Sequence, residues 1–261
     1  MKRRTRALVM LAGLVALLGA AMWAELAREE RARTQPLTHV AAGAATRIAV
    51  ACRTGCANRV FERAADGWRM IEPYALPAAD EAIARLVAIA QAPVRKRRAA
   101  REFDMAKIGL DPPVASIRVG ELAIDVGTTD AINNLRYVRL ADDVALVPDR
   151  AAAWLFAPAE SELDRHLAPR GVALATVRID GAERPALVAA WQAVTTSQVV
   201  ASNTVPVETT PPRRVELVAV GGATIRYALS RAEGRYVAVR DDLPLAYPLD
   251  EAQMQQLLPS P

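Results

Sequence analysis

Residues 46–71 read TRIAVACRTGCANRVFERAADGWRMI, and they carry the clearest signal about the fold class. Short apolar runs at Arg47–Ala51, Asn58–Arg63 and Trp68–Ile71 are separated by turn-forming residues, a pattern that predicts strands. Asp66-Gly67 is typical of a hairpin turn, because glycine accepts the positive φ that such turns require. The stretch therefore predicts a meander of three antiparallel strands.

A helix is predicted shortly after the meander, over residues 80–91. Asp80 and Glu81 lie in its first turn, where negative charges interact favourably with the helix dipole. The apolar residues recur at the spacing of one helix face, at Ile83, Leu86, Val87 and Ala90. We expect this stripe to cover one face of the sheet.

Further short apolar runs predict strands along the rest of the chain. In the first half they lie at Val114–Val119, Glu121–Val126, Leu135–Leu140 and Val144–Val147. In the second half they lie at Ala173–Ile179, Ala186–Trp191, Arg214–Val220, Thr224–Ser230 and Arg235–Arg240. Helices are predicted at Arg150–Phe156, Ser161–Leu167 and Asp250–Leu258, and a long exposed loop at residues 194–213.

The N-terminal segment predicts a membrane anchor. Residues 7–24 are uncharged and largely apolar, and as a helix they span about 27 Å, close to the thickness of the hydrocarbon core. Four cationic residues precede this run and favour retention of the N-terminus in the cytoplasm. A cleaved signal peptide is the alternative, with a small-residue site at Gly19–Ala21. In both cases we expect the body in the periplasm, and with an uncleaved anchor the protein is single-pass in the inner membrane.

The predicted organisation is α+β: an N-terminal transmembrane helix followed by two small modules of antiparallel sheet with covering helices. The cytoplasmic tip and anchor cover residues 1–24, and a linker covers 25–45. The first module covers 46–168 and the second 169–261. A short internal echo supports two similar modules, because residues 136–143 (RYVRLADD) resemble residues 235–242 (RYVAVRDD).

The charge distribution argues against nucleic acid as a partner. The net charge is +4, but Lys2, Arg3, Arg4 and Arg6 alone supply four positive charges. The 255 residues from 7 to 261 carry 29 basic and 29 acidic side chains. A neutral body has no broad positive surface for polyanions.

Cys52 and Cys56 are the two cysteines of the chain, and they flank a predicted turn between strands. Facing positions across such a turn are close enough for a disulfide, which an oxidising compartment favours. Free thiols, or a redox or metal role for the C-x-x-x-C spacing, are the alternatives.

No residue pattern in the sequence predicts catalysis, a cofactor or a metal site. His39 and His166 are the two histidines, too few for a histidine metal site, and there is no G-x-S-x-G motif around a serine. Gly127-Thr128-Thr129-Asp130 lacks the G-K-[ST] of a phosphate loop and predicts a polar connection between strands. We therefore expect a protein that is not an enzyme.

A dense basic cluster is the one candidate contact site of the body. It consists of Arg95, Lys96, Arg97, Arg98 and Arg101. Such a cluster can bind anionic lipid headgroups or an acidic partner. The alternative is a solvated edge strand whose charges discourage aggregation.

Four short motifs follow one another in a characteristic order. They are GWRMIEP at residues 67–73, PAAD at 77–80, IGLDPP at 108–113 and LRYV at 135–138. In these motifs the chain resembles a bacterial envelope family known as domain of unknown function 4340, over residues 46–166 and more loosely beyond. The resemblance implies a single-pass membrane protein with an exported α+β body, and no catalytic residues. Many members of that family are encoded near gliding-type ABC transporter components.

The sequence therefore predicts a membrane-anchored periplasmic accessory or scaffold protein of an envelope or transport complex, with membrane proteins as its partners. A periplasmic binding module for a small or polymeric ligand is the alternative. An enzyme of unrecognised type is a third possibility.

Overall fold

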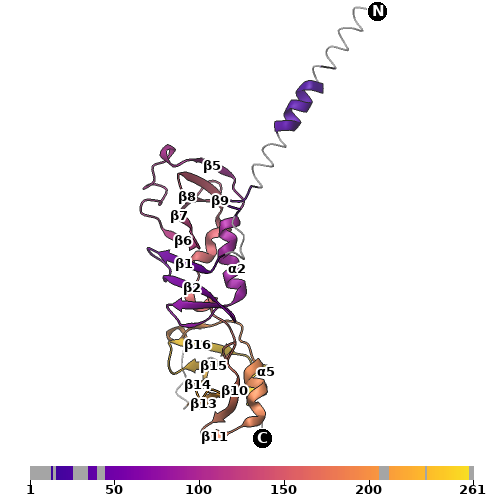
Figure 1. Ribbon diagram of the computed structural model, residues 1–261, viewed down its shortest axis with the longest axis vertical. Coiled ribbons are helices and arrows are strands. Elements are labelled where there is room, and N and C mark those ends of the chain that lie inside the picture. The colour runs from indigo at the N-terminus through magenta and orange to yellow at the C-terminus, as the bar shows by residue number, and fades with distance from the viewer. Residues whose placement is uncertain are drawn as a thin grey trace, which may run out of the picture. The chain divides into compact units, whose positions relative to one another are not determined.

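The predicted meander is present, and the chain is α+β with two antiparallel sheets and a few helices (Figure 1). The computed structural model describes residue 13 and residues 16–25, 35–39, 45–205, 212–232 and 234–258. Much of the predicted anchor lies outside this set, although residues 16–25 are helical and exposed. Within the described residues, no helix combines the length and the apolar composition that crossing a bilayer requires.

The chain forms two compact units. Unit 1 comprises Met1–Val40, Ala88–Val114 and Ala123–Ala152, and unit 2 comprises Ala41–Val87, Ala115–Leu122 and Ala153–Pro261. The strands of the first sheet come from residues 47–148, and those of the second come from residues 174–249.

In unit 2 the meander forms the centre of one set of strands. Its order is β4-β3-β2-β1-β6, with β1 at Arg47–Cys52, β2 at Arg59–Ala64, β3 at Gly67–Glu72, β4 at Leu76–Pro77 and β6 at Ala115–Val119. Ile48 pairs with Phe61, and Phe61 pairs with Met70. All three side chains are fully buried. The alternation of apolar residues therefore gives this sheet one core face, as the sequence predicts.

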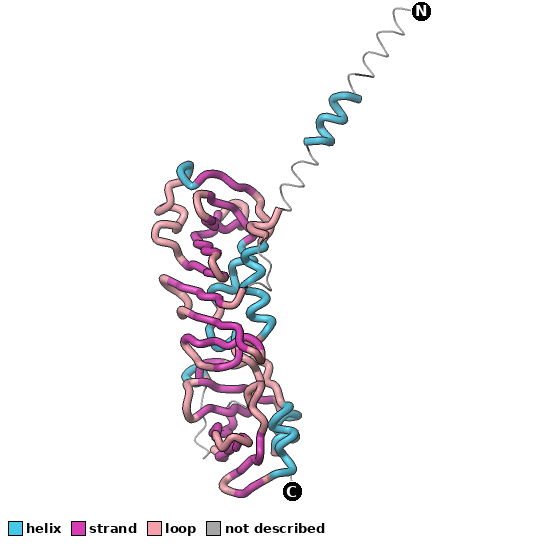
Figure 2. The backbone as a smooth tube through the Cα atoms, viewed as in Figure 1, coloured by secondary structure: helices cyan, strands magenta, loops and turns pink. Residues whose placement is uncertain are grey.

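Unit 2 also contains the second sheet, in the order β11-β10-β13-β14-β15-β16-β12. Figure 2 draws its strands, like those of the first sheet, in magenta. Its long strands pair through buried apolar residues, for example Val177 with Leu217 and Val215 with Tyr227. The strands are β10 (Leu174–Ile179), β11 (Ala182–Glu183), β12 (Val200–Ala201), β13 (Arg213–Ala219), β14 (Thr224–Ala232), β15 (Arg235–Arg240) and β16 (Leu245–Leu249).

Three predictions in this half are wrong. The predicted strand at residues 186–191 is helical, because Pro185 opens a 3-10 turn, η6 at Pro185–Leu187, that continues into α4 at Val188–Ala193. Strand β16 was not predicted, since Pro248 lies within it. The predicted loop at 194–213 contains β12 and the 3-10 turn η7 at Ser202–Thr204, and Val199 within it is buried. Residues 206–211 lie outside the described set.

The helices follow the expected pattern in part. Helix α2, at Asp80–Ala88, continues into the 3-10 turn η2 at Ile89–Gln91, and the predicted stripe is buried at all four positions. The predicted helix at 161–167 is replaced by a 3-10 turn, η5 at Ala159–Glu162. The closing helix α5, at Glu251–Leu257, begins with a capping box at Asp250. The other helical segments are α3 (Asp149–Ala152), η3 (Ala100–Glu102) and η4 (Ala153–Phe156).

Unit 1 contains the remaining strands in the order β7-β8-β9-β5. They are β7 at Leu122–Asp130, β8 at Leu135–Leu140, β9 at Asp143–Pro148 and β5 at Lys96–Ala99. The predicted polar connection at Gly127 is part of β7, next to a bulge in the pairing with β8. A β-carbon at Gly127 would collide with the Ile108 carbonyl oxygen, so this position requires glycine.

The predicted disulfide between Cys52 and Cys56 is present, with a Cα–Cα distance of 5.7 Å. It closes the turn between β1 and β2. We expect Cys52→Ser/Cys56→Ser to fold with an unchanged sheet but to lose about 2 kcal/mol of unfolding free energy, because so small a loop constrains the unfolded chain only modestly. Urea unfolding of the full chain in detergent checks this. Failure of the variant to fold would contradict the local role of the bond.

Candidate functional site

A fully buried arginine lies at the centre of the candidate site, within unit 2. Arg59 begins β2, and none of its surface is exposed (0%). Its guanidinium donates to the carbonyl oxygens of Leu155 and Ala157, both at 2.5 Å, and lies 3.3 Å from Glu162 Oε1. A buried cation requires such acceptors, because leaving water costs several kcal/mol. Arg59 therefore fixes the chain around residues 155–162 against β2.

Glu162, the partner of Arg59, is also buried, at the end of η5. Burial raises the pKa of Glu162 to about 7, and the attraction of Arg59 and Arg85 offsets this only in part. Burial lowers the pKa of Arg59, but a guanidinium stays protonated in proteins. Near neutral pH the pair therefore changes between an ion pair and a carboxylic acid beside a guanidinium.

Side chains from three elements surround this pair. The Tyr74 hydroxyl donates to Glu160 Oε1 at 2.6 Å, and burial followed by this hydrogen bond raises the pKa of Tyr74. The Arg85 guanidinium lies over the Trp154 ring, 4.4 Å from its centroid. These contacts tie the segment before β4 to η5, which carries Glu162, and α2 to Trp154 in the preceding turn.

The chain after Glu162 runs extended between two other segments of unit 2. On one side the Ala79 amide donates to the Glu162 carbonyl, and the Asp164 amide donates to the Pro77 carbonyl. On the other side the Thr196 amide donates to the Arg165 carbonyl at 2.9 Å. Residues 162–166 therefore join the end of the first set of strands to the loop before β12.

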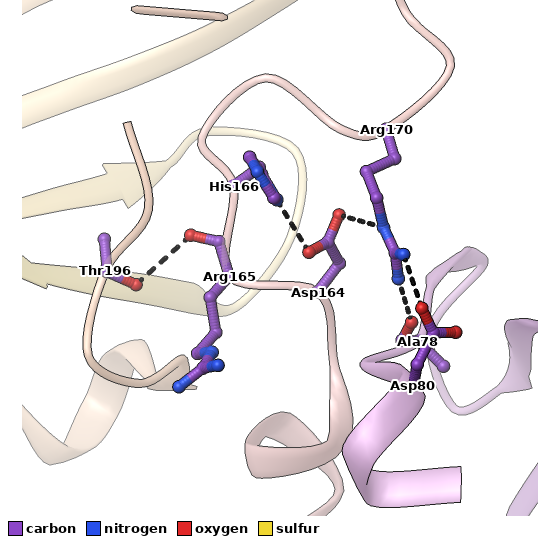
Figure 3. Close-up of polar contacts among 7 residues, drawn as sticks. All are labelled: Ala78, Asp80, Asp164, Arg165, His166, Arg170 and Thr196. Atoms are coloured by element: carbon purple, nitrogen blue, oxygen red, sulfur yellow. Dashed lines mark hydrogen bonds and ion pairs between the residues drawn. The ribbon is translucent and has the colours of Figure 1, made fainter. Parts of the chain in front are cut away.

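Asp164 and Arg170 hold this segment in place (Figure 3). Arg170 donates to Asp164 Oδ2 at 3.0 Å, to Asp80 Oδ2 at 2.8 Å and to the Ala78 carbonyl at 2.6 Å. The other Asp164 oxygen lies 2.8 Å from His166 Nδ1, which carries the proton because a carboxylate only accepts. Hydrogen bonding to Asp80, together with Asp164, raises the pKa of Arg170.

Two buried tyrosines complete the network on the side of the second sheet. The Tyr227 hydroxyl donates to the Leu167 carbonyl at 2.6 Å, and its ring packs edge-on against Tyr247. Burial raises the pKa of both phenols, so they remain neutral donors at physiological pH. The Tyr227 hydroxyl thereby satisfies a backbone carbonyl of the segment that a buried loop would otherwise leave unpaired.

The arrangement holds structural elements together. Both oxygens of Asp164 and all three nitrogens of the Arg170 guanidinium contact neighbouring groups of the protein. The Asp164–His166 pair has the geometry that orients a general base. The His166 side chain is half-buried. Within the described residues, histidine, cysteine, aspartate and glutamate form no group of three that could hold a metal ion.

The sequence analysis did not single out Arg59, Glu162 or Arg170. One signal for Arg59 was available: it stands two residues before Phe61, so the strand period places a charged residue on the core face of β2. The pairing of Glu162 and Arg170 with residues far along the chain leaves no local pattern.

The residues predicted as a contact site all lie in unit 1. The structure places them on and beside β5, with exposed side chains, and Arg97 donates to the Leu37 carbonyl at 2.8 Å. His39 is exposed in the segment before β1. An open cavity of about 320 Å³ lies elsewhere, in unit 2, lined by residues that include Arg235, Tyr236 and Asp250.

The model of the family described as Domain of unknown function (DUF4340) matches residues 68–260, nearly three quarters of the chain. The chain belongs to the DUF4340 family. The match confirms the resemblance in the sequence motifs and extends through the second sheet of this DUF4340 protein. Searches of curated proteins and of solved structures gave no significant match.

The raised pKa of Glu162 predicts that its contribution to the unfolding free energy falls as the pH rises. Its pKa is raised from 4.5 to about 7 on folding, so the folded state keeps a proton that the unfolded state releases between these values. This stabilisation is complete below about pH 4.5 and lost above about pH 7, and it amounts to roughly 3–4 kcal/mol at about 1.4 kcal/mol per pKa unit. Urea unfolding between about pH 4.5 and pH 7 should show that the unfolding free energy of Glu162→Gln depends less on pH than that of the unmodified chain. Exposed Glu121→Gln is the matched control, and an equal profile in both variants would contradict the assignment.

We expect the role of Arg170 to require the shape of its guanidinium as well as its positive charge. Arg170→Lys keeps the cation but loses the fork that reaches three acceptors, so we expect a loss of about 1–2 kcal/mol and faster hydrogen exchange at the Asp164 amide. Arg165→Lys is the control, because the Arg165 guanidinium is exposed and meets the Ser197 carbonyl only at 3.4 Å. If both variants exchanged alike at Asp164, the role given to Arg170 would be wrong.

Proposed function

We propose that this DUF4340 protein is a non-enzymatic accessory or scaffold subunit of an envelope or transport complex. In this proposal residues 7–24 anchor it in the inner membrane as a single span, the N-terminus lies in the cytoplasm, and the body lies in the periplasm. The partners are membrane proteins of the same complex. The apolar run and its cationic flank support this orientation.

The observation that carries the proposal is the packing of the segment that follows the apolar run. Leu37 is buried, and its amide donates to the Ala92 carbonyl at 2.8 Å. The Thr38 amide donates to Ala90, and the Val94 amide donates to Gln35. The chain therefore becomes part of the folded body within about a dozen residues of the predicted span. Such a connection suits a protein that holds a partner at a fixed distance from the membrane.

The polar network of unit 2 supports a structural role. Arg59, Glu162, Asp164 and Arg170 contact one another or backbone carbonyls. Interactions of this kind rigidify a body and hold its segments in one arrangement. A rigid body with fixed surfaces is what a scaffold needs.

The sheet edges indicate how partners would bind. The strands at the ends of the two sheets are β4, β5, β11 and β12, and they have between two and four residues. Short edge strands discourage the addition of a strand from another protein. We therefore expect partners to contact side-chain surfaces.

The second candidate function is a binding module, and the cavity beside Arg235 and Tyr236 favours it. Its volume of about 320 Å³ is at the lower end of the range for small-ligand sites. A thermal-shift screen of the full chain in detergent tests this, because a ligand that binds the folded state raises the melting temperature.

Membrane retention tests the anchor. We expect the full chain to resist alkaline extraction, and Leu17→Arg to abolish this, because a central arginine costs about 2.5–3.5 kcal/mol on insertion. Gln35→Arg adds the same charge outside the apolar run and should leave retention unchanged. Intact mass separates an uncleaved anchor from a processed signal peptide. A C-terminal reporter that is active only in the cytoplasm would contradict the proposed orientation.

Partner capture tests the scaffold role. We expect in-cell crosslinking followed by purification in detergent to recover a membrane protein of the envelope in defined stoichiometry. Leu17→Arg should lose this partner, because the body is no longer held at the membrane. If crosslinking recovered no partner with either the unmodified chain or Leu17→Arg, this result would count against a scaffold.

A further inference from the structure

The basic cluster lies on an edge strand of unit 1. Strand β5 pairs with β9 on one side and ends the strand order of its sheet. Arg95, Lys96, Arg97 and Arg98 are all exposed. The cluster therefore presents its cations to whatever lies beside this edge.

The strand register divides the cluster between two ends of the sheet. Lys96 pairs with Leu146, whereas Ala99 pairs with Asp143 at the other end of β9. On β8, Leu135 pairs with Pro148, so the β7–β8 turn lies beyond the end that Lys96 occupies. The Arg95 end of β5 and the turn at residues 131–134 consequently share one end of the sheet.

The segment that leads from the predicted anchor reaches this same end. The Val94 amide donates to the Gln35 carbonyl at 2.9 Å, and Arg97 Nη2 donates to the Leu37 carbonyl at 2.8 Å. Ten residues separate the predicted span from Gln35, which limits the separation to about 35 Å even when fully extended.

An exposed apolar side chain also lies at this end. Ile132 is 90% exposed at the tip of the β7–β8 turn. Strands β8 and β5 are two strand spacings apart, or roughly 10 Å. A large apolar side chain beside several cations is the combination that binds an anionic membrane interface.

The acidic residues leave this end positive. Its turn carries Asp130, whose carboxylate accepts hydrogen bonds from the turn itself, and Asp149 is paired with Arg136. At the opposite end acidic residues accompany the cations, because Arg98 lies 3.7 Å from Glu102 Oε2 and Ala99 pairs with Asp143 in the strand register.

We propose that Arg95, Lys96, Arg97 and Ile132 form a surface that binds anionic phospholipid headgroups of the bilayer that carries the anchor. The proposal rests on the proposed function for the presence of that bilayer. Each cation close to an anionic surface strengthens binding about fivefold. The surface would then fix the orientation of unit 1 on the membrane.

A probe at position 132 tests the proposal in the full chain. The two native cysteines are bonded to each other, so Ile132→Cys offers a single thiol for an environment-sensitive fluorophore. The labelled chain is reconstituted into vesicles of phosphatidylcholine alone or of phosphatidylcholine with phosphatidylglycerol. We expect a blue shift in the vesicles with phosphatidylglycerol, and its loss at high salt.

Charge reversal supplies the matched pair of variants. Arg95→Glu/Lys96→Glu should abolish the shift, whereas Arg98→Glu/Arg101→Glu, with the same change in charge, should retain it. Equal shifts in both lipids, or equal loss in both variants, would overturn the proposal. The proposal would also be overturned if the chain resisted alkaline extraction but showed no blue shift. That result would leave the proposed anchor standing and would favour an acidic protein as the partner of the cluster. A chain released by alkali that still floats with the phosphatidylglycerol vesicles alone would support it and contradict the anchor.

Discussion

The burial of a single guanidinium governs the arrangement of unit 2. Arg59 lies on the core face of β2, where an arginine cannot remain without acceptors. The Leu155 and Ala157 carbonyls and the Glu162 carboxylate meet this need, and all three come from residues 155–162, about a hundred positions later in the chain. The segment that follows is thereby held where Asp164 and Arg170 can pair. Arg59 thus links the meander to residues 155–162, and Arg170 links the chain that follows to Ala78 and Asp80.

Arg59 and Glu162 form a buried ion pair among apolar residues of unit 2. A buried ion pair contributes little net stability compared with an apolar replacement, yet its requirements are specific, because each donor must meet a defined acceptor. Glu162 adds sensitivity to pH, since its burial places its titration near neutrality. The periplasmic location that we propose would expose such a group to external acidity. The cations on and beside β5 in unit 1 differ, because their side chains are exposed and can contact a charged surface.

Local patterns explain which elements could be predicted. Alternating apolar residues around Phe61 and the stripe at Ile83 and Leu86 specify strand and helix over a few residues, and both elements are present. Strand β16 was missed, and its residues 246–249 pair with β15 although Pro248 lies among them. The apolar run at 186–191 suggested a strand, but Pro185 begins a helical turn there and Trp191 is buried on α4.

The sequence by itself determined the charge pattern and predicted the α+β class, the family and the disulfide, because apolar runs, short motifs and the Cys52–Cys56 spacing are patterns of residues close together in the chain. Only the tertiary structure decided which polar groups meet. Arg59 and Glu162 are separated by about a hundred positions, as are Asp80 and Arg170, and their pairing follows from the packing of sheets and turns. The tertiary structure also placed the residues of the basic cluster at two ends of one sheet, because pairing with β9 sets the register of β5.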